Sequence, residues 1–249
     1  MRTDRWLPLV LGLGWMGGYR AVTGGWPPLP PLDASGWLFW LAGVLGVGGA
    51  LLPSVRPALR LGLAIGLSAP VLYGILAARV HYAWTPVVAG LWIGGLALAF
   101  GACTAVNAAV ALKLPPRPAL ASLLVTTGGA AVALGTTGSL LLGGLGAVLA
   151  AEMAVLLVRP SEAGVRAARI VAMPVLFGAV VIGGFYSALP VGSAALLLLA
   201  PMGALVVGRA RPWLGVLACA LLALAAIGVG LAQAGLMDAA AKLVSELHH

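Results

Sequence analysis

The chain has 249 residues, of which 62% are hydrophobic and only 8% charged, and its mean hydropathy is +1.10. Soluble domains carry about a quarter charged residues, so this composition excludes an ordinary soluble domain. The formal net charge of +8 comes from basic residues scattered among short loops, which excludes a nucleic-acid-binding patch. We therefore expect a multi-pass protein of the cell (plasma or inner) membrane whose first partner is the lipid bilayer.

Nine apolar segments are long enough to cross a bilayer as helices, given about 20 residues per span with tolerance for tilt. They are residues 6–22, 37–53, 61–80, 87–112, 119–135, 139–158, 170–188, 191–208 and 213–235. The third segment contains Pro70, where we expect a kink. The sequence thus predicts an all-α bundle of about nine transmembrane helices, with one membrane domain over residues 1–235.

The basic residues indicate how the chain threads the membrane. With the N-terminus inside and the C-terminus outside, three of the 14 basic residues lie outside: Arg20, Arg79 and Lys242. The others fall on the inner side, as the positive-inside rule requires: Arg2, Arg5, Arg56, Arg60, Lys113, Arg117, Arg159, Arg166, Arg169, Arg209 and Arg211. Trp6 and Trp213 then mark the inner interface.

Small residues at helical spacing predict where helices approach one another closely. Three such stripes stand out: Ala42, Gly46 and Ala50; Gly90 and Gly94; and Gly143, Ala147, Ala150 and Ala154. The glycines at 12, 14 and 17 spell a dinucleotide-binding motif, but here they fall inside a membrane helix, where that interpretation fails.

Residues 236–249 form an amphipathic tail that is suited to lying on the outer membrane surface. The chain ends in His248 and His249, for which an appended tag and a metal ligand are equal alternatives. Elsewhere the sequence predicts no metal site and no cofactor. Cys103 and Cys219 both lie inside apolar segments without ligand spacing, and His81 is the only histidine before the tail.

Glu152 is the only acidic residue inside an apolar segment. A charged side chain at such a depth costs roughly 2.5–3.5 kcal/mol on insertion scales, so the carboxyl must be protonated, paired or in contact with water. In the structural interpretation Arg159 folds back to pair with Glu152, or a neutral carboxyl hydrogen-bonds to another helix. In the functional interpretation Glu152 is a proton or cation site.

Several polar side chains share the depth of Glu152, about 10 Å from the inner interface at ~1.5 Å per helical residue. They are Ser68, Thr104, Asn107, Thr126, Thr127 and Cys219. We expect either a shared polar site around Glu152 and Asn107 or, for the serine and threonines, hydrogen bonds to their own helix backbone.

A second polar group lies toward the outer side, where Arg20, Arg79 and His81 occur beside Tyr19, Tyr82 and Trp84. It predicts either an anion or lipid-headgroup site or, as we favour, simple anchoring at the interface.

Two functions fit these features. The first is a small-solute permease or transporter with Glu152 as the coupling group. The second is a non-catalytic membrane subunit that anchors or completes a larger complex or a homo-oligomer. An intramembrane enzyme is the least favoured class, because it would need a cluster of His, Asp or Glu that the sequence lacks. Substrate and coupling ion leave no signature in the sequence.

Overall fold

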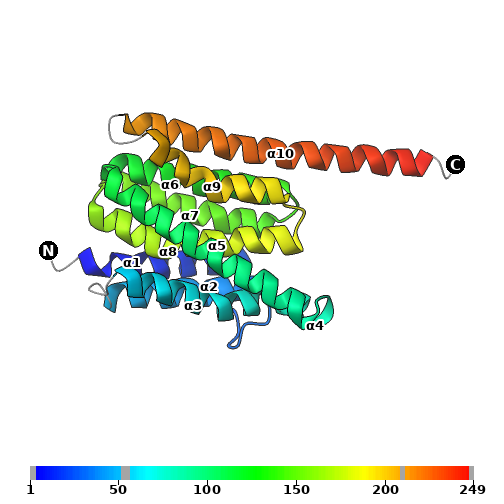
Figure 1. The fold of residues 1–249 in the computed structure, drawn as a ribbon, viewed down its shortest axis with the longest axis horizontal. Coiled ribbons are helices and arrows are strands. Elements are labelled where there is room, and N and C mark those ends of the chain that lie inside the picture. Colours follow the sequence, from blue (N-terminus) through cyan, green and yellow to red (C-terminus); the bar gives the residue numbers. More distant parts are fainter. Residues whose placement is uncertain (1–3, 52–56, 208–210, 247–249) are drawn as a thin grey trace.

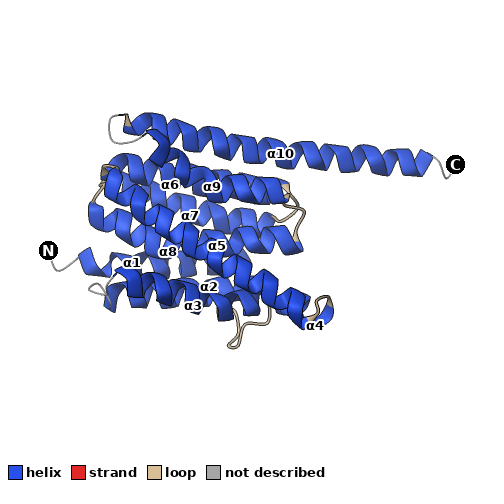
Figure 2. Cartoon of the chain, in the orientation of Figure 1, coloured by secondary structure: helices blue, strands red, loops and turns tan. Residues whose placement is uncertain are grey.

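The computed structural model describes residues 4–51, 57–207 and 211–246, and over these residues it contains helices and connecting turns without strands (Figure 2). The elements are η1 (Asp4–Trp6), α1 (Leu7–Thr23), α2 (Ala34–Leu51), α3 (Pro57–Ile75), α4 (Ala77–Tyr82), α5 (Pro86–Lys113), α6 (Pro116–Thr136), α7 (Leu140–Val158), α8 (Glu162–Tyr186), α9 (Val191–Val207) and α10 (Pro212–Glu246). The all-α prediction is confirmed.

Six of the described helices are long and apolar enough to cross a membrane, namely α2, α5, α6, α7, α8 and α10. The remaining long helices fall short for different reasons: α1 has 17 residues, and the apolar described parts of α3 and α9 are shorter still. The bundle is therefore compatible with an integral membrane protein, while the count of nine spans stays a prediction.

Helix α8 forms the centre of the bundle (Figure 1). Its residues are buried without interruption from Val171 to Gly183, and it packs against α1, α2, α3, α5, α6, α7 and α9. Two aromatic contacts fix its antiparallel register with α5: Phe177 lies 5.3 Å from Phe100, and Phe185 lies 5.1 Å from Trp92, between ring centroids.

Close approaches between glycines hold neighbouring helices together. On α1, a Cβ at Gly12 would stand 2.7 Å from the Ala42 carbonyl oxygen and 3.1 Å from the Gly46 Cα atom, so the α1 and α2 backbones touch. The predicted stripe on α2 is therefore confirmed at Ala42 and Gly46. On α7, Gly143 and Gly146 meet the α6 backbone at Gly135 and Ala131 in the same way.

The other two predicted stripes are wrong in part. Ala147 and Ala154 are exposed on the surface of the bundle, and of that stripe Gly143 makes the backbone contact. Gly90 and Gly94 on α5 meet no atom within 4 Å. A small residue permits a close approach without requiring one, because the partner helix decides which face is used.

The predicted third span, residues 61–80, is divided in the structure. Helix α3 ends at Ile75, and the short helix α4 follows from Ala77. Tyr186 of α8 donates its hydroxyl to the Ile75 carbonyl oxygen at 3.0 Å, so a side chain binds the carbonyl that residue 79 would otherwise bind. Pro70 lies inside α3, five residues before this division.

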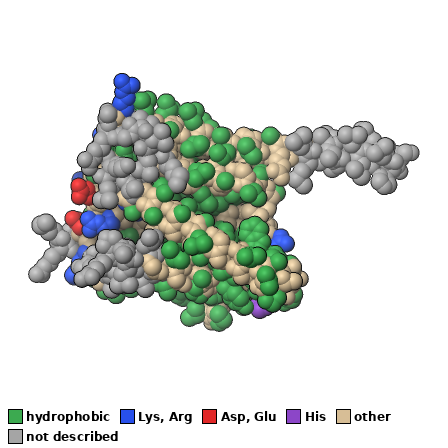
Figure 3. All heavy atoms as spheres, in the orientation of Figure 1, with side chains coloured by type: hydrophobic (Ala, Val, Ile, Leu, Met, Phe, Trp, Pro, Cys, Tyr) green, Lys and Arg blue, Asp and Glu red, His purple; other side chains and the backbone are tan. Residues whose placement is uncertain are grey.

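The two ends of the bundle differ in chemistry. Figure 3 shows charged side chains gathered where α1 begins, with a hydrophobic middle. We call this end the basic end; it carries the exposed side chains of Arg5, Arg117, Arg159, Arg166 and Arg211. The opposite end carries α4 and a cluster of Trp84, Trp92 and Phe185.

Helix α10 runs from the basic end past the opposite end of the bundle (Figure 1). Residues 213–235 and the first part of the predicted tail thus form one continuous helix that reaches Glu246. The tail's amphipathic side chains, like His248 and His249, lie outside the residues whose side chains the structure describes.

Candidate functional site

Glu152 lies on α7 where this helix packs against α1. A Cβ at Gly14 would stand 2.7 Å from the Glu152 Oε1 atom, so the carboxylate rests directly on the α1 backbone. The contact continues one turn later on α1 and one turn earlier on α7, where the side chain of Val148 lies against Gly18. A further turn on, the side chain of Val22 lies against Gly144 of α7. We call this contact, made by Gly14, Gly18, Gly144 and Glu152, the glycine seam.

Both carboxylate oxygens of Glu152 are buried, and neither has a hydrogen-bond partner within the part of the chain that the structure describes. The side chain as a whole is partly exposed, so the aliphatic stem reaches the surface while the carboxylate faces inward. An ionised carboxylate in such a place is strongly disfavoured, because it has lost water and gained no donor.

The structure does not pair Glu152 with Arg159. Arg159 is exposed at the end of α7, and neither oxygen of Glu152 accepts a bond from it. The structural interpretation in which Arg159 folds back is therefore not observed. Arg159 instead belongs to the basic end.

The serine, asparagine and threonines at the depth of Glu152 bind their own helices. Each donates to a carbonyl oxygen three or four residues earlier, at 2.7–2.9 Å: Ser68 to Ile65, Thr104 to Phe100, Asn107 to Cys103, Thr126 to Ser122 and Thr127 to Leu123. This satisfies the donors without a second helix. Asn107 lies on α5, whereas Glu152 lies on α7 where it meets α1, and no hydrogen bond joins the two side chains.

The outer polar residues divide between separate contacts. Arg20 donates to the Gly24 carbonyl oxygen at the end of α1. Arg79 donates to the Phe185 carbonyl oxygen at 2.7 Å and lies over the Tyr186 ring, so it caps the end of α8. His81 contacts the exposed Tyr73 hydroxyl at 3.4 Å. These partners are structural, and they suit anchoring.

Arg169 is a residue that the sequence analysis placed outside the membrane. Helix α8 begins at Glu162, eight residues before the predicted start of that span, so Arg169 lies inside a helix that could cross a membrane. The sequence carries a signal for this earlier start, because serine is a favoured N-cap residue and a glutamate in the first turn suits the helix dipole. In the structure the Ser161 hydroxyl accepts a hydrogen bond from the Gly164 amide at 3.0 Å, and Glu162 occupies the first turn. The Nη2 atom of Arg169 is buried and has no hydrogen-bond partner among the described residues.

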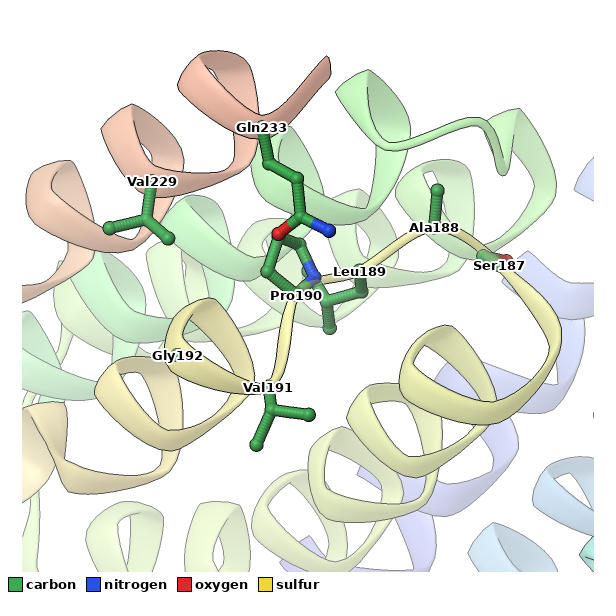
Figure 4. A pocket seen from close by; sticks show the side chains of 8 residues that line it. All are labelled: Ser187, Ala188, Leu189, Pro190, Val191, Gly192, Val229 and Gln233. Carbon is green, nitrogen blue, oxygen red and sulfur yellow. The ribbon is translucent and has the colours of Figure 1, made fainter. Parts of the chain in front are cut away.

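Two hollows are found elsewhere on the bundle. A pocket of about 620 Å³ lies beside the α8–α9 turn, where Gln233 of α10 reaches toward Pro190 (Figure 4). An apolar groove of about 290 Å³ runs along the contact between α6 and α10 and is lined by Gly128, Gly129 and Ala223 among others. Neither hollow includes Glu152. The first is wide open with few polar side chains, so we place the candidate site at the glycine seam.

The sequence matches no protein-family model, no curated protein and no solved structure.

Proposed function

We propose that the protein is a polytopic membrane permease in which Glu152 takes up and releases a proton as α1 and α7 close and separate. The observation that carries this proposal is the enclosed carboxylate, whose two oxygens lack a hydrogen-bond donor in the described structure. Intramembrane ionisable residues are costly and rare, and they commonly mark ion pathways and proton relays.

The coupling follows from the two states of the carboxyl group. With the glycine seam closed, nothing compensates a negative charge, so the closed arrangement selects the neutral acid. Ionisation needs water at the oxygens, and water reaches them when α1 moves away from Glu152. A ligand that favours one arrangement would thereby favour one protonation state.

The seam is suited to such movement. At Gly14 and Gly18, α1 presents no side chain of its own to α7, and the Glu152 carboxylate and the Val148 side chain lie against its backbone. On the other face of α1, Leu11, Trp15 and Tyr19 are buried in the core and hold α1 there.

The proposed threading has nine spans in the cell membrane, with the basic end inside. Exposed arginines at that end support it, since short cytoplasmic loops carry an excess of Lys and Arg. The start of α1 and the end of α10 lie at opposite ends of the bundle (Figure 1), as an odd number of crossings requires.

The experiment compares Glu152→Gln with Glu162→Gln in proteoliposomes that enclose a pH-sensitive dye. Glu162 is an exposed carboxylate at the start of α8, so its variant controls for the loss of one negative charge. Amino acids, sugars and organic anions are added outside in turn. We expect one class to drive proton movement with the wild type and Glu162→Gln but not with Glu152→Gln. Equal proton movement with Glu152→Gln would refute the proposal.

A second function, a non-catalytic subunit of a membrane complex, is favoured by different observations. The apolar groove between α6 and α10 and the open glycine face of α5, at Gly90, Gly94 and Gly95, resemble surfaces made for further helices. Purification in mild detergent separates the two functions, because a subunit brings stoichiometric partner chains with it and a permease is stable alone or with its own copies.

A further inference from the structure

Arg169 differs from the exposed arginines of the basic end, because part of its guanidinium is buried. Arg20 and Arg79 each donate to a backbone carbonyl oxygen, whereas Arg169 makes no hydrogen bond or ion pair in the described structure. Its Nη2 atom is buried and the side chain as a whole is half-buried, so part of the guanidinium has left water without gaining a partner. Snorkelling alone would leave that end of the side chain exposed.

A guanidinium does not lose its proton in a protein, so Arg169 keeps a full positive charge in this setting. A buried charge without a partner is costly, and the usual remedy is an anion that also accepts hydrogen bonds. The described part of the chain supplies none: Glu162 and Asp4 are exposed, and no ion pair joins either of them to Arg169.

Glu152 lies at a different level of the bundle and does not act as the anionic partner of Arg169. A Cβ at Gly49 would stand 2.8 Å from Pro8 and 3.0 Å from Ile170, so Ile170 is level with Pro8 of α1. Glu152 rests on Gly14, six residues further along α1, which is roughly 9 Å at 1.5 Å per residue. The two unpaired groups therefore occupy different levels, with Arg169 nearer the basic end.

We propose that Arg169 binds a phosphate group beside α8 at the basic end. The fork of guanidinium N–H groups matches phosphate oxygens in a two-bond geometry. Arg166, one turn earlier on α8, and Arg159, at the preceding turn, are exposed and add positive charge at the same end. Anionic lipid headgroups of the inner leaflet carry such a phosphate, and basic sites between membrane helices on that side bind them.

The test measures thermal stability of the purified full chain with three additions. Phosphatidylglycerol supplies an anionic lipid phosphate, phosphatidylcholine supplies a phosphate on a neutral headgroup, and inorganic phosphate in neutral detergent supplies the free anion. We compare the wild type with Arg169→Met, which keeps side-chain length without charge, and with Arg166→Met as the matched exposed control. Arg169→Lys tests whether the two-bond geometry matters.

We expect phosphatidylglycerol to raise the melting temperature of the wild type and of Arg166→Met, and to raise that of Arg169→Met far less. Arg169→Lys should respond in between. Without added lipid, Arg169→Met should be at least as stable as the wild type, because the substitution removes an unpaired buried charge. A merely structural arginine would instead leave the variant less stable throughout.

The additions also identify the source of the phosphate. An Arg169-dependent rise with inorganic phosphate alone assigns the site to a soluble phosphate, and one with phosphatidylglycerol assigns it to lipid. Equal responses of the wild type and Arg169→Met to all three additions would overturn the proposal. None of these outcomes depends on proton movement through Glu152, so the two proposals stand or fall separately.

Discussion

The carboxylate of Glu152 rests on the backbone of Gly14: its Oε1 atom lies 2.7 Å from the point where a Cβ on that residue would stand. Any side chain larger than hydrogen at position 14 would therefore displace the carboxylate. This relationship joins a glycine of α1 to the acid of α7, and it makes the state of the acid depend on the distance between the two helices.

Gly14→Ala should move the Glu152 carboxylate out of the glycine seam. A contact of 2.7 Å is shorter than real Cβ atoms tolerate, but the atom displaced is the far end of a flexible side chain, so the fold should survive. We expect a lipid-soluble carbodiimide, which reacts with protonated carboxyl groups, to label Glu152 several-fold faster in this variant, as measured by peptide mass spectrometry.

Gly17→Ala is the matched control for that measurement, because a Cβ at Gly17 meets no atom within 4 Å. Its labelling rate should equal that of the wild type. If Gly14→Ala is labelled no faster than Gly17→Ala, then the carboxylate is already accessible, and the enclosed site is wrong.

Gly12→Val should destabilise the bundle. The new Cβ would stand 2.7 Å from the Ala42 carbonyl oxygen, which is backbone and cannot rotate away, so α1 and α2 must move apart. Overpacking of this kind costs about 1–3 kcal/mol. The measurement is reversible unfolding in mixed detergent, with Gly17→Val on the same helix as the control; equal stability of both variants would contradict the close α1–α2 contact.

Tyr186→Phe removes the hydroxyl that binds the Ile75 carbonyl oxygen across 111 residues of sequence. Loss of one such hydrogen bond should cost about 0.5–1.5 kcal/mol of unfolding free energy. Tyr82→Phe is the control, because Tyr82 is 90% exposed. Should the two variants unfold alike, the hydroxyl of Tyr186 contributes nothing to the division between α3 and α4.

The threading can be tested with single cysteines and a membrane-impermeant maleimide applied to intact cells. Gly25→Cys lies in the exposed α1–α2 loop, and Pro160→Cys lies in the exposed α7–α8 turn at the basic end. We expect Gly25→Cys to be labelled in intact cells, and Pro160→Cys to be labelled only after the cells are permeabilised. The reverse pattern would invert the proposed orientation and transfer the Arg169 site to the outer leaflet.

The approximate positions of the helices followed from apolar length, because a bilayer requires a fixed run of residues and few sequences satisfy it by accident. The predicted segment 87–112 corresponds to α5, Pro86–Lys113. The predicted start at 170 was eight residues late for α8, since the hydropathy pattern stopped at Arg166 and Arg169 while the cap at Ser161 indicated an earlier start. An N-cap outweighs hydropathy there because it satisfies backbone donors directly.

The sequence identified the central residue of the candidate site, Glu152, but it did not predict which residues surround it. The isolated charge of Glu152 identified it in the sequence, since nothing else acidic lies within an apolar segment. Equal depth, however, did not bring Asn107 or Thr126 to it, because their donors bind carbonyls on their own helices. Depth along the helix axis does not say which helices are neighbours, so residues at the same depth can lie on opposite sides of the bundle.

By itself the sequence predicted the apolar helices and the level of most charges along them, Arg169 excepted, because hydropathy and helical rise act along one dimension. The tertiary structure decided which faces meet. It placed Gly14 under Glu152, left Gly90 and Gly94 without a neighbour, and buried the Nη2 atom of Arg169 without a partner among the described residues. The physical reason is that packing between helices depends on complementary shapes from distant segments, which no local pattern contains.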